Sequence, residues 1–170
     1  LESIEIISDG QLPQVLITAS TTELTCTTNS ITLEGSGNGQ YSWSNNLGAE
    51  PTATVNQPGT YTLTITGENG CSSTTSIIIT ENTVLPIVEI SSSSGTALCP
   101  NSSLTLTSSP SAIYSWSNGS SQQAITVSEP GIYEVQVEGT NGCTSSQSIE
   151  ITSAPEPEPV ITVEGNLTFC

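Results

Sequence analysis

The chain has 170 residues, of which 16 are acidic and none is Lys, Arg or His, so its formal net charge at pH 7 is -16. Without these residues a Ser or Cys nucleophile would lack its usual base, and no cationic side chain could bind phosphate or stabilise an oxyanion. We therefore expect no enzyme activity, no cofactor and no binding to nucleic acid, which depends on cationic contacts to phosphate.

The composition favours a folded, all-β protein over a disordered one. Charged residues make up only 9% of the chain and hydrophobic residues 34%. Val, Ile and Leu alternate with Thr and Ser, which is typical of strands with one buried face. The sequence contains no run of about 18 apolar residues, so we expect no direct insertion into a membrane.

Strands are predicted in chain order from pairs of apolar residues two positions apart. The first has Val15 and Ile17 facing inward and Leu16 facing outward. The inward positions that follow are Ile31 and Leu33, then Tyr41 and Trp43, then Ala53 and Val55, then Tyr61, Leu63 and Ile65, and finally Ile77 and Ile79. Period-two alternation in six or seven short strands, separated by Gly, Pro and Asn turns, predicts a β-sandwich.

The same pattern occurs twice, with a spacing of about 73 residues. Cys26 aligns with Cys99, the run Tyr-Ser-Trp-Ser-Asn at 41–45 recurs at 114–118, and Asn-Gly-Cys at 69–71 recurs at 141–143. We therefore predict tandem immunoglobulin-like repeats at 13–85 and 86–158. Residues 1–12 match the last strand of a preceding repeat, and residues 159–170 the first strand of a following one.

Each complete repeat has two cysteines at matching positions, which suggests an oxidising compartment. We predict one disulfide within each repeat, joining Cys26 to Cys71 and Cys99 to Cys143. Cys170 would then bond to a residue outside this sequence. A structural zinc site is the alternative, but it needs about four nitrogen or sulfur ligands, and each repeat offers two cysteines and no His.

The motifs resemble the immunoglobulin-like or PKD-like repeats of giant Bacteroidota surface proteins, such as SprB-type adhesins. The resemblance is carried by Tyr-Ser-Trp-Ser-Asn-Gly at 114–119, Pro-Gly-Ile-Tyr at 130–133 and Asn-Gly-Cys at 141–143, and it covers both complete repeats. It implies secretion and a role in adhesion or in surface filaments. It does not identify a ligand.

Four aromatic residues are assigned structural roles. Trp43 and Trp116 lie two residues after a Tyr on the same strand face, which favours a core position over a sugar-stacking platform. Tyr61 and Tyr133 follow Pro-Gly at the start of the longest strand, as in a tyrosine corner, where the hydroxyl bonds to nearby backbone.

Two functions of the carboxylates would be calcium binding and catalysis as a glycosidase pair. No acidic residue of one complete repeat aligns with an acidic residue of the other, and the chain has a single Asp, at position 9. A repeated calcium site, which would need several convergent oxygens, is not expected. We predict no metal site, and we interpret the scattered charges as solubilising.

The sequence therefore predicts a non-enzymatic structural segment of a large extracellular cell-surface protein, forming an extended stalk or filament that supports adhesion. Its expected partners are neighbouring repeats of the same chain, with lateral or end-to-end self-association into a filament. The alternative is a glycan-binding module in which each repeat binds carbohydrate through its loops. The loops after the two Trp residues share only their first Asn, which favours the stalk.

Overall fold

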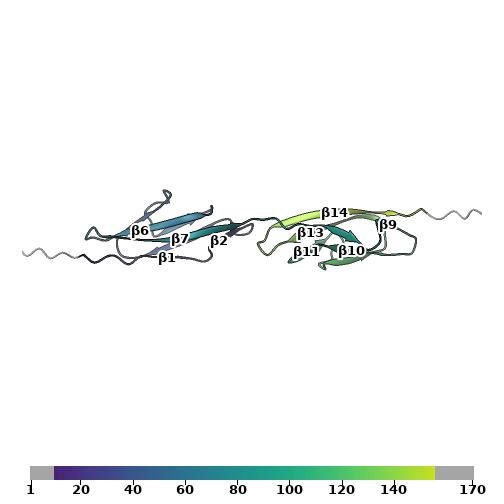
Figure 1. Ribbon diagram of the computed structural model, residues 1–170, viewed down its shortest axis with the longest axis horizontal. Helices are drawn as coiled ribbons and strands as arrows, with labels where there is room; N and C mark the ends of the chain where they lie inside the picture. The colour runs from purple at the N-terminus through teal and green to yellow at the C-terminus, as the bar shows by residue number, and fades with distance from the viewer. Residues whose placement is uncertain (1–9, 156–170) are drawn as a thin grey trace, which may run out of the picture. The chain divides into compact units, whose positions relative to one another are not determined.

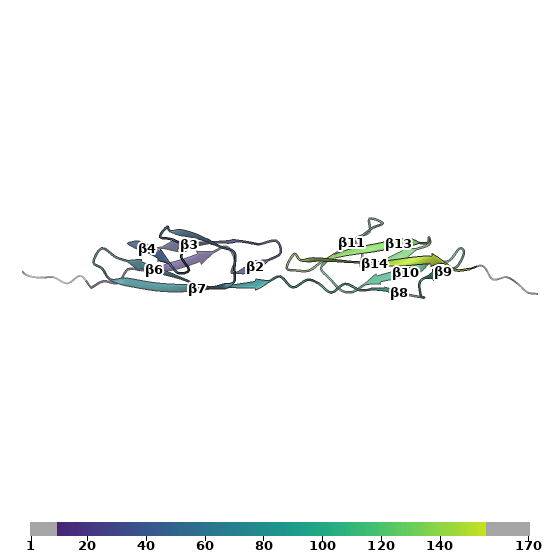
Figure 2. The same cartoon turned by 90° about the horizontal axis from the view of Figure 1, so that it is seen from above.

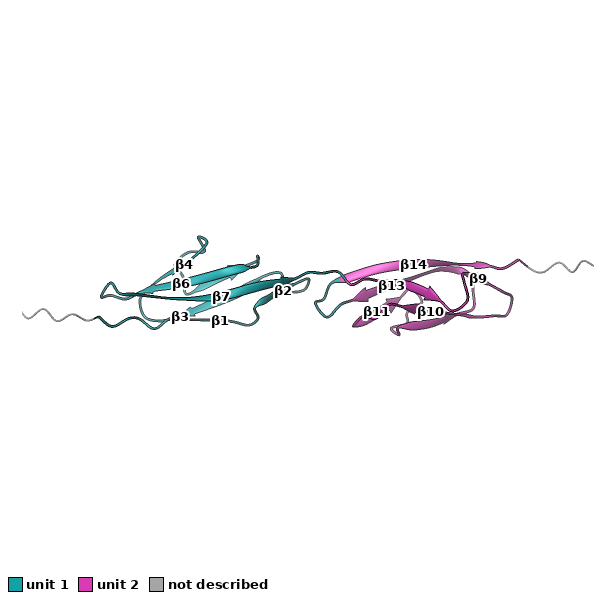
Figure 3. Ribbon diagram, in the orientation of Figure 1, with its two compact units in different colours: residues 1–85, 139–143 teal, residues 86–138, 144–170 magenta. Residues whose placement is uncertain are grey.

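The computed structural model describes residues 10–155, which form two compact units. One consists of residues 10–85 together with 139–143, and the other of 86–138 together with 144–155. Figure 3 shows the two units in different colours. The short segment 139–143 thus lies in the second repeat of the sequence but belongs to the first unit. The predicted end strands at 1–12 and 159–170 lie wholly or largely outside the described residues, as does Cys170.

The first unit contains seven strands in its described part (Figures 1 and 2). They are β1 (Leu16–Ala19), β2 (Glu23–Thr25), β3 (Ile31–Ser36), β4 (Gln40–Trp43), β5 (Thr52–Val55), β6 (Gly59–Thr66) and β7 (Ser72–Asn82). They form a three-stranded sheet in the order β1-β3-β5 and a four-stranded sheet in the order β2-β7-β6-β4.

This strand order is that of an immunoglobulin-like sandwich. β1, β3 and β5 take the places of strands A, B and E in one sheet, and β4, β6 and β7 those of C, F and G in the other. β2 continues the first strand after it crosses to the second sheet, where it pairs with β7 in parallel. All other strand pairs in this unit are antiparallel.

The second unit repeats the arrangement with β8 (Ile90–Ser92), β9 (Ala97–Leu98), β10 (Leu104–Ser108), β11 (Ile113–Trp116), β12 (Ala124–Val127), β13 (Gly131–Glu138) and β14 (Thr144–Ser153). The sheet orders are β12-β10-β8 and β11-β13-β14-β9, with β9 parallel to β14. The predicted all-β, immunoglobulin-like fold is confirmed, with no helix among residues 10–155.

Each unit has its own core between its two sheets. In the first unit, Leu33 from β3 and Leu63 and Ile65 from β6 have no exposed surface, and Trp43 packs into the same cluster. In the second, Leu106, Val135 and Val137 are equally buried. Alternate residues of these strands point to the two faces of a sheet, so the Thr, Ser and Glu between them face outward.

Candidate functional site: the Cys26–Cys143 disulfide

Cys26 is bonded to Cys143, with their Cα atoms 5.0 Å apart and 117 positions apart in the sequence. Both belong to the first unit, although they lie in different repeats of the sequence. The predicted pairs Cys26–Cys71 and Cys99–Cys143 are therefore wrong. Cys71 and Cys99 are free thiols, the first partly exposed and the second exposed.

The parallel strand β2 explains why Cys26 does not reach Cys71. Cys26 follows β2, whose last residue, Thr25, lies opposite Asn82 at the end of β7. Cys71 immediately precedes β7, at its other end. This strand has 11 residues and at about 3.3 Å per residue spans about 35 Å, whereas bonded cysteines have Cα atoms about 4.4–6.8 Å apart.

The second unit separates its cysteines in the same way. Cys99 follows β9, where Leu98 pairs with Ser153, the last residue of β14. Cys143 immediately precedes β14, which has 10 residues and spans about 33 Å. Within a repeat, the two cysteines thus lie at opposite ends of the last strand, and only a cysteine from another repeat can meet either of them.

The loop that carries Cys143 is a tight hairpin turn between β13 and β14. The Gly139 amide donates to the Cys143 carbonyl at 2.9 Å, and the Gly142 amide to the Gly139 carbonyl at 3.0 Å. The Asn141 carboxamide oxygen accepts from the Cys143 amide at 3.2 Å. Gly142 has φ of 72°, in the left-handed region that Gly tolerates best, as expected for the Asn-Gly turn.

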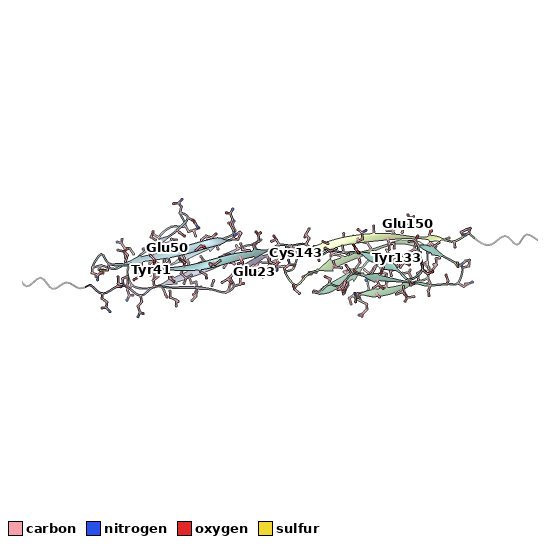
Figure 4. The ribbon with its side chains drawn as sticks, in the orientation of Figure 1. Glu23, Tyr41, Glu50, Tyr133, Cys143 and Glu150 are labelled. Atoms are coloured by element: carbon pink, nitrogen blue, oxygen red, sulfur yellow. A yellow bond between two sulfur atoms is a disulfide. The ribbon has the colours of Figure 1, made fainter. Side chains whose placement is uncertain are left out.

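Asn141 also anchors this loop to the end of β7 and to the chain segment that follows it. Its Nδ2 donates to the Val84 carbonyl at 2.8 Å, the Asn82 carbonyl at 3.2 Å and the Asn82 side-chain oxygen at 3.1 Å. All three acceptors belong to the first unit. The hydrogen bonds and the disulfide together hold residues 139–143 on this unit, and Figure 4 labels Cys143.

Gly142 lies against the loop after Cys26. A Cβ atom at this position would be 2.5 Å from Thr27 Cγ2 and 2.9 Å from Thr27 Oγ1. Any side chain would therefore displace Thr27, which is the neighbour of the bonded Cys26. Glycine is required here for close approach as well as for its backbone conformation.

The corresponding loop of the first repeat has the same internal structure. The Gly67 amide donates to the Cys71 carbonyl at 2.8 Å, and the Cys71 amide donates to the Asn69 side-chain oxygen at 3.0 Å. Asn69 Nδ2 donates to the carbonyl of Gln11 at 2.9 Å. Gln11 and Val84 occupy equivalent positions, 73 residues apart, so the two loops bind the backbone of the segment before their own repeat in the same way.

The Asn-Gly pairs at 69–70 and 141–142 indicate hairpin turns, but the sequence did not show that Asn69 and Asn141 also anchor their loops. The available signal was the recurrence of Asn-Gly-Cys as a unit, because the turn by itself needs Asn-Gly but not the adjacent cysteine.

The four aromatic residues singled out from the sequence are occupied by structural contacts. Trp43 and Trp116 are 5% and 3% exposed, and their indole N–H groups donate to the carbonyls of Glu50 at 2.9 Å and Gln122 at 2.8 Å. The Tyr61 hydroxyl donates to the Gln57 carbonyl at 2.8 Å, and that of Tyr133 to the Glu129 carbonyl at 2.9 Å. Tyr61 is buried and Tyr133 is partly buried against the second core.

Residues 10–155 contain no group of three or more carboxylate and cysteine side chains placed to hold a metal ion. The same part of the chain has no helix long and apolar enough to cross a membrane. The first unit has an open depression whose lining includes Pro13, Gly37 and Gly67.

The sequence matches no protein-family model and no curated protein. Among solved structures, the chain is similar to murine CEACAM1b, with 12% identity and a TM-score of 0.41. The match covers 83% of this chain and 100% of the CEACAM1b chain. It is also similar to fibronectin(III)-like modules of Clostridium thermocellum CbhA, with 10% identity and a TM-score of 0.37. This match covers 81% of this chain and 94% of the CbhA chain. The strand order within each unit is what identifies the immunoglobulin-like fold.

Proposed function

We propose that this chain is a non-enzymatic structural segment of a large secreted cell-surface protein, and that it forms part of an extended stalk that supports adhesion. The observation that carries the proposal is the bond between Cys26 of one sequence repeat and Cys143 of the next. A disulfide between repeats adds nothing to the chemistry of a binding pocket, but it makes the connection between successive repeats covalent at a second point.

The bond also supports an extracellular location. Structural disulfides persist in oxidising compartments and are rare in the cytosol. The net charge of -16 without a compensating cation disfavours collapse of neighbouring chains onto one another and keeps an exposed chain soluble.

Burial of both Trp residues supports a stalk over a glycan-binding module. Carbohydrate sites commonly present an exposed aromatic face, whereas here both indole rings lie in the cores and their N–H groups are bonded to backbone. The four Tyr residues offer no exposed platform either. Tyr41 and Tyr61 pack in the first core and Tyr114 and Tyr133 against the second, and each hydroxyl is hydrogen-bonded to the backbone.

The first test is a screen of the 170-residue chain against glycans and cell surfaces, once with calcium and once with a chelator. We expect no saturable binding in either condition. The matched variants replace Asn46 and Glu50 in the loop after Trp43, or Ser121 and Gln122 in the loop after Trp116, by Ala. Saturable binding that one of these variants abolishes would overturn the stalk and make the repeat an adhesive module.

Small-angle scattering tests the extended form directly. A compact protein of this length would have a radius of gyration of about 15 Å. The proposed stalk segment should give a value well above this for the oxidised chain, and a value near 15 Å would contradict the proposal.

A further inference from the structure

The Cys26–Cys143 junction is built from two halves, and this chain contains a second example of each half. One half is the cysteine that follows the parallel strand, represented by Cys26 and Cys99. The other is the cysteine that ends the Asn-Gly-Cys loop, represented by Cys143 and Cys71. The first example of each is bonded to the other, and the second examples are free thiols.

We infer that Cys99 and Cys71 are half-sites of the same kind of junction, and that each bonds to the complementary cysteine of a neighbouring repeat. Cys99 would bond to the loop cysteine of the repeat that follows it, and Cys71 to the strand cysteine of the repeat that precedes it. Every repeat would then be joined to both neighbours by disulfides, and none would contain an internal one.

The loop half is the better defined. The loop at residues 67–71 has the same internal hydrogen bonds as the loop at 139–143, and Gly70 has φ of 77° where Gly142 has 72°. Asn69 already bonds to the carbonyl of Gln11, as Asn141 does to that of Val84. Because Asn141 makes this contact in the bonded junction, the segment before the first repeat lies on the Cys71 loop in the same way as at the formed bond.

The strand half is also repeated. Thr80 of β7 donates its amide to the Thr22 carbonyl at 2.8 Å, and Thr152 of β14 donates to the Thr96 carbonyl at the same distance. Leu24 and Leu98, on the two parallel strands, are buried at 3% and 5% exposure. These contacts bring Cys26 and Cys99 to the same end of their sandwiches, beyond the last residue of the long strand.

The two strand halves differ in the spacing between the buried Leu and the cysteine. Cys26 comes two residues after Leu24, whereas Cys99 comes directly after Leu98. Both cysteines are nevertheless five residues before the next core position, Ile31 or Leu104, so the shortening lies on the strand side. The exposed Cys99 therefore remains in the turn that leads to β10, where the Ser102 amide donates to the Cys99 carbonyl at 3.1 Å.

The chemistry is thiol–disulfide exchange. Two thiols form one sulfur–sulfur bond and give up two protons and two electrons. The acceptor is the disulfide of an external thiol oxidant, which is reduced to two thiols. We expect two like half-sites not to complete a junction, since the bond in the structure joins one loop cysteine to one strand cysteine.

The test adds one repeat to the chain. A second copy of residues 86–158 is inserted after residue 158, with the copy of Cys99 replaced by Ala and the copy of the exposed Thr144 replaced by Ser, so that the peptide with the inserted loop cysteine has its own mass. Cys170 is replaced by Ala in this chain and in the original. Both proteins are oxidised, thiols are blocked, and the non-reduced proteins are cleaved at Glu and at aromatic residues for mass spectrometry. The original chain should show Cys26–Cys143 and two blocked thiols, Cys71 and Cys99.

In the longer chain, Cys99 should lose its blocked form and appear bonded to the loop cysteine of the inserted repeat, while Cys71 stays blocked. A blocked Cys99, or a bond from Cys99 to Cys143 or Cys71 within the chain, would overturn the inference. The variant Cys143→Ala in the longer chain should keep the new bond, since it removes only the other junction. Loss of the new bond in that variant would contradict independent junctions.

A second arm identifies the source of the complementary thiol. Oxidation of the original chain at high concentration should join copies through Cys99 of one and Cys71 of the next if a separate copy can complete the junction. Bonds between two Cys99 residues or two Cys71 residues would contradict the complementary pairing. The inference does not depend on the proposed stalk, because the pairing is measured without reference to binding or shape.

Discussion

Asn141 donates from its Nδ2 to the carbonyl oxygen of Val84 at 2.8 Å, although 57 residues separate them. The same nitrogen lies within hydrogen-bonding distance of both oxygens of Asn82, while the carboxamide oxygen accepts from the Cys143 amide. A single side chain thus holds the turn in shape and attaches it to the first unit. The two functions use different atoms and can be separated by substitution.

The substitution Asn141→Asp keeps the acceptor oxygen but replaces the donor by a second, charged oxygen that faces the Val84 and Asn82 carbonyls. We expect the free energy of unfolding of the first unit to fall by about 1–3 kcal/mol, because three acceptors lose their hydrogen-bond donor. Urea unfolding followed by circular dichroism measures the loss. Asn118→Asp is the charge-matched control, since Asn118 accepts from the Ser120 amide and should tolerate the change. Equal effects of the two substitutions would contradict the anchoring role.

Gly142→Ala and Gly70→Ala form a matched pair. Both positions have positive φ, which disfavours Ala, so each substitution should lower the free energy of unfolding by about 1 kcal/mol. At Gly142 a Cβ would meet Thr27 Cγ2, whereas at Gly70 no atom of residues 10–155 lies within 4 Å of a Cβ. We therefore expect the Gly142 variant to be the less stable of the two, and to re-form the Cys26–Cys143 bond more slowly after reduction.

The comparison is read from thermal unfolding and from the rate of thiol loss during reoxidation. Adding Thr27→Ala to Gly142→Ala should recover much of the difference, because it removes the two closest atoms. If the two glycine variants behave alike, the loop does not lie against Thr27 in solution.

Removal of the disulfide should weaken the protein without unfolding it. Each unit has a separate buried core, so the double variant Cys26→Ala, Cys143→Ala should keep its β-type circular dichroism spectrum. The loop-entropy model gives an upper limit of about 5 kcal/mol for closing a loop of this length. We expect a lower unfolding midpoint in urea, and the same shift when the unaltered protein is reduced.

The control for this experiment is Cys71→Ala, Cys99→Ala, which removes the two free thiols and should leave the midpoint unchanged. A lower midpoint for the control and an unchanged one for the first variant would mean that the pairing in solution differs from that in the structure.

Trp43→Ala should lower the free energy of unfolding of the first unit by about 3–5 kcal/mol. Removal of the nearly fully buried ring leaves a cavity, and the Glu50 carbonyl loses its hydrogen-bond donor. The chain has two Trp residues, so fluorescence of this variant comes from Trp116 alone. We expect the fluorescence midpoint to stay in place while the circular dichroism signal begins to fall at lower urea. A parallel shift of both signals would show that the two units unfold together.

Most of the fold could be predicted from the sequence, because comparison of the two repeats shows which residues are buried. Positions such as Leu33 and Leu106 stay apolar while their neighbours vary, which identifies the buried face of each strand without further information. The pairing of the sheets is less local. Nothing in Glu23–Thr25 shows that this short strand lies parallel to the end of β7, because its sequence would fit an antiparallel edge equally well.

The predicted disulfides are wrong because the sequence does not show the direction of these short strands. Two cysteines in each repeat suggest an internal bond, and four cysteines allow three connectivities that spacing alone does not distinguish. Only the direction of β2 and β9 places the cysteines of one repeat at opposite ends of a strand. The role of Asn141 could not be predicted for a similar reason, since its acceptors on Asn82 and Val84 lie almost 60 residues away in the sequence.

The connectivity of the bond also determines how the chain would respond to tension. A pulling force applied at the two ends reaches Cys26 and Cys143 and passes through the sulfur–sulfur bond, so residues 27–142 carry no load. Among the buried residues of the two cores in the described chain, only Leu24 and Ile151 lie outside this closed loop. Drawn out fully, the enclosed residues would add about 400 Å to the chain's length. With the bond intact, that length cannot be released until a covalent bond is reduced, and stretching is confined to the short segments on either side.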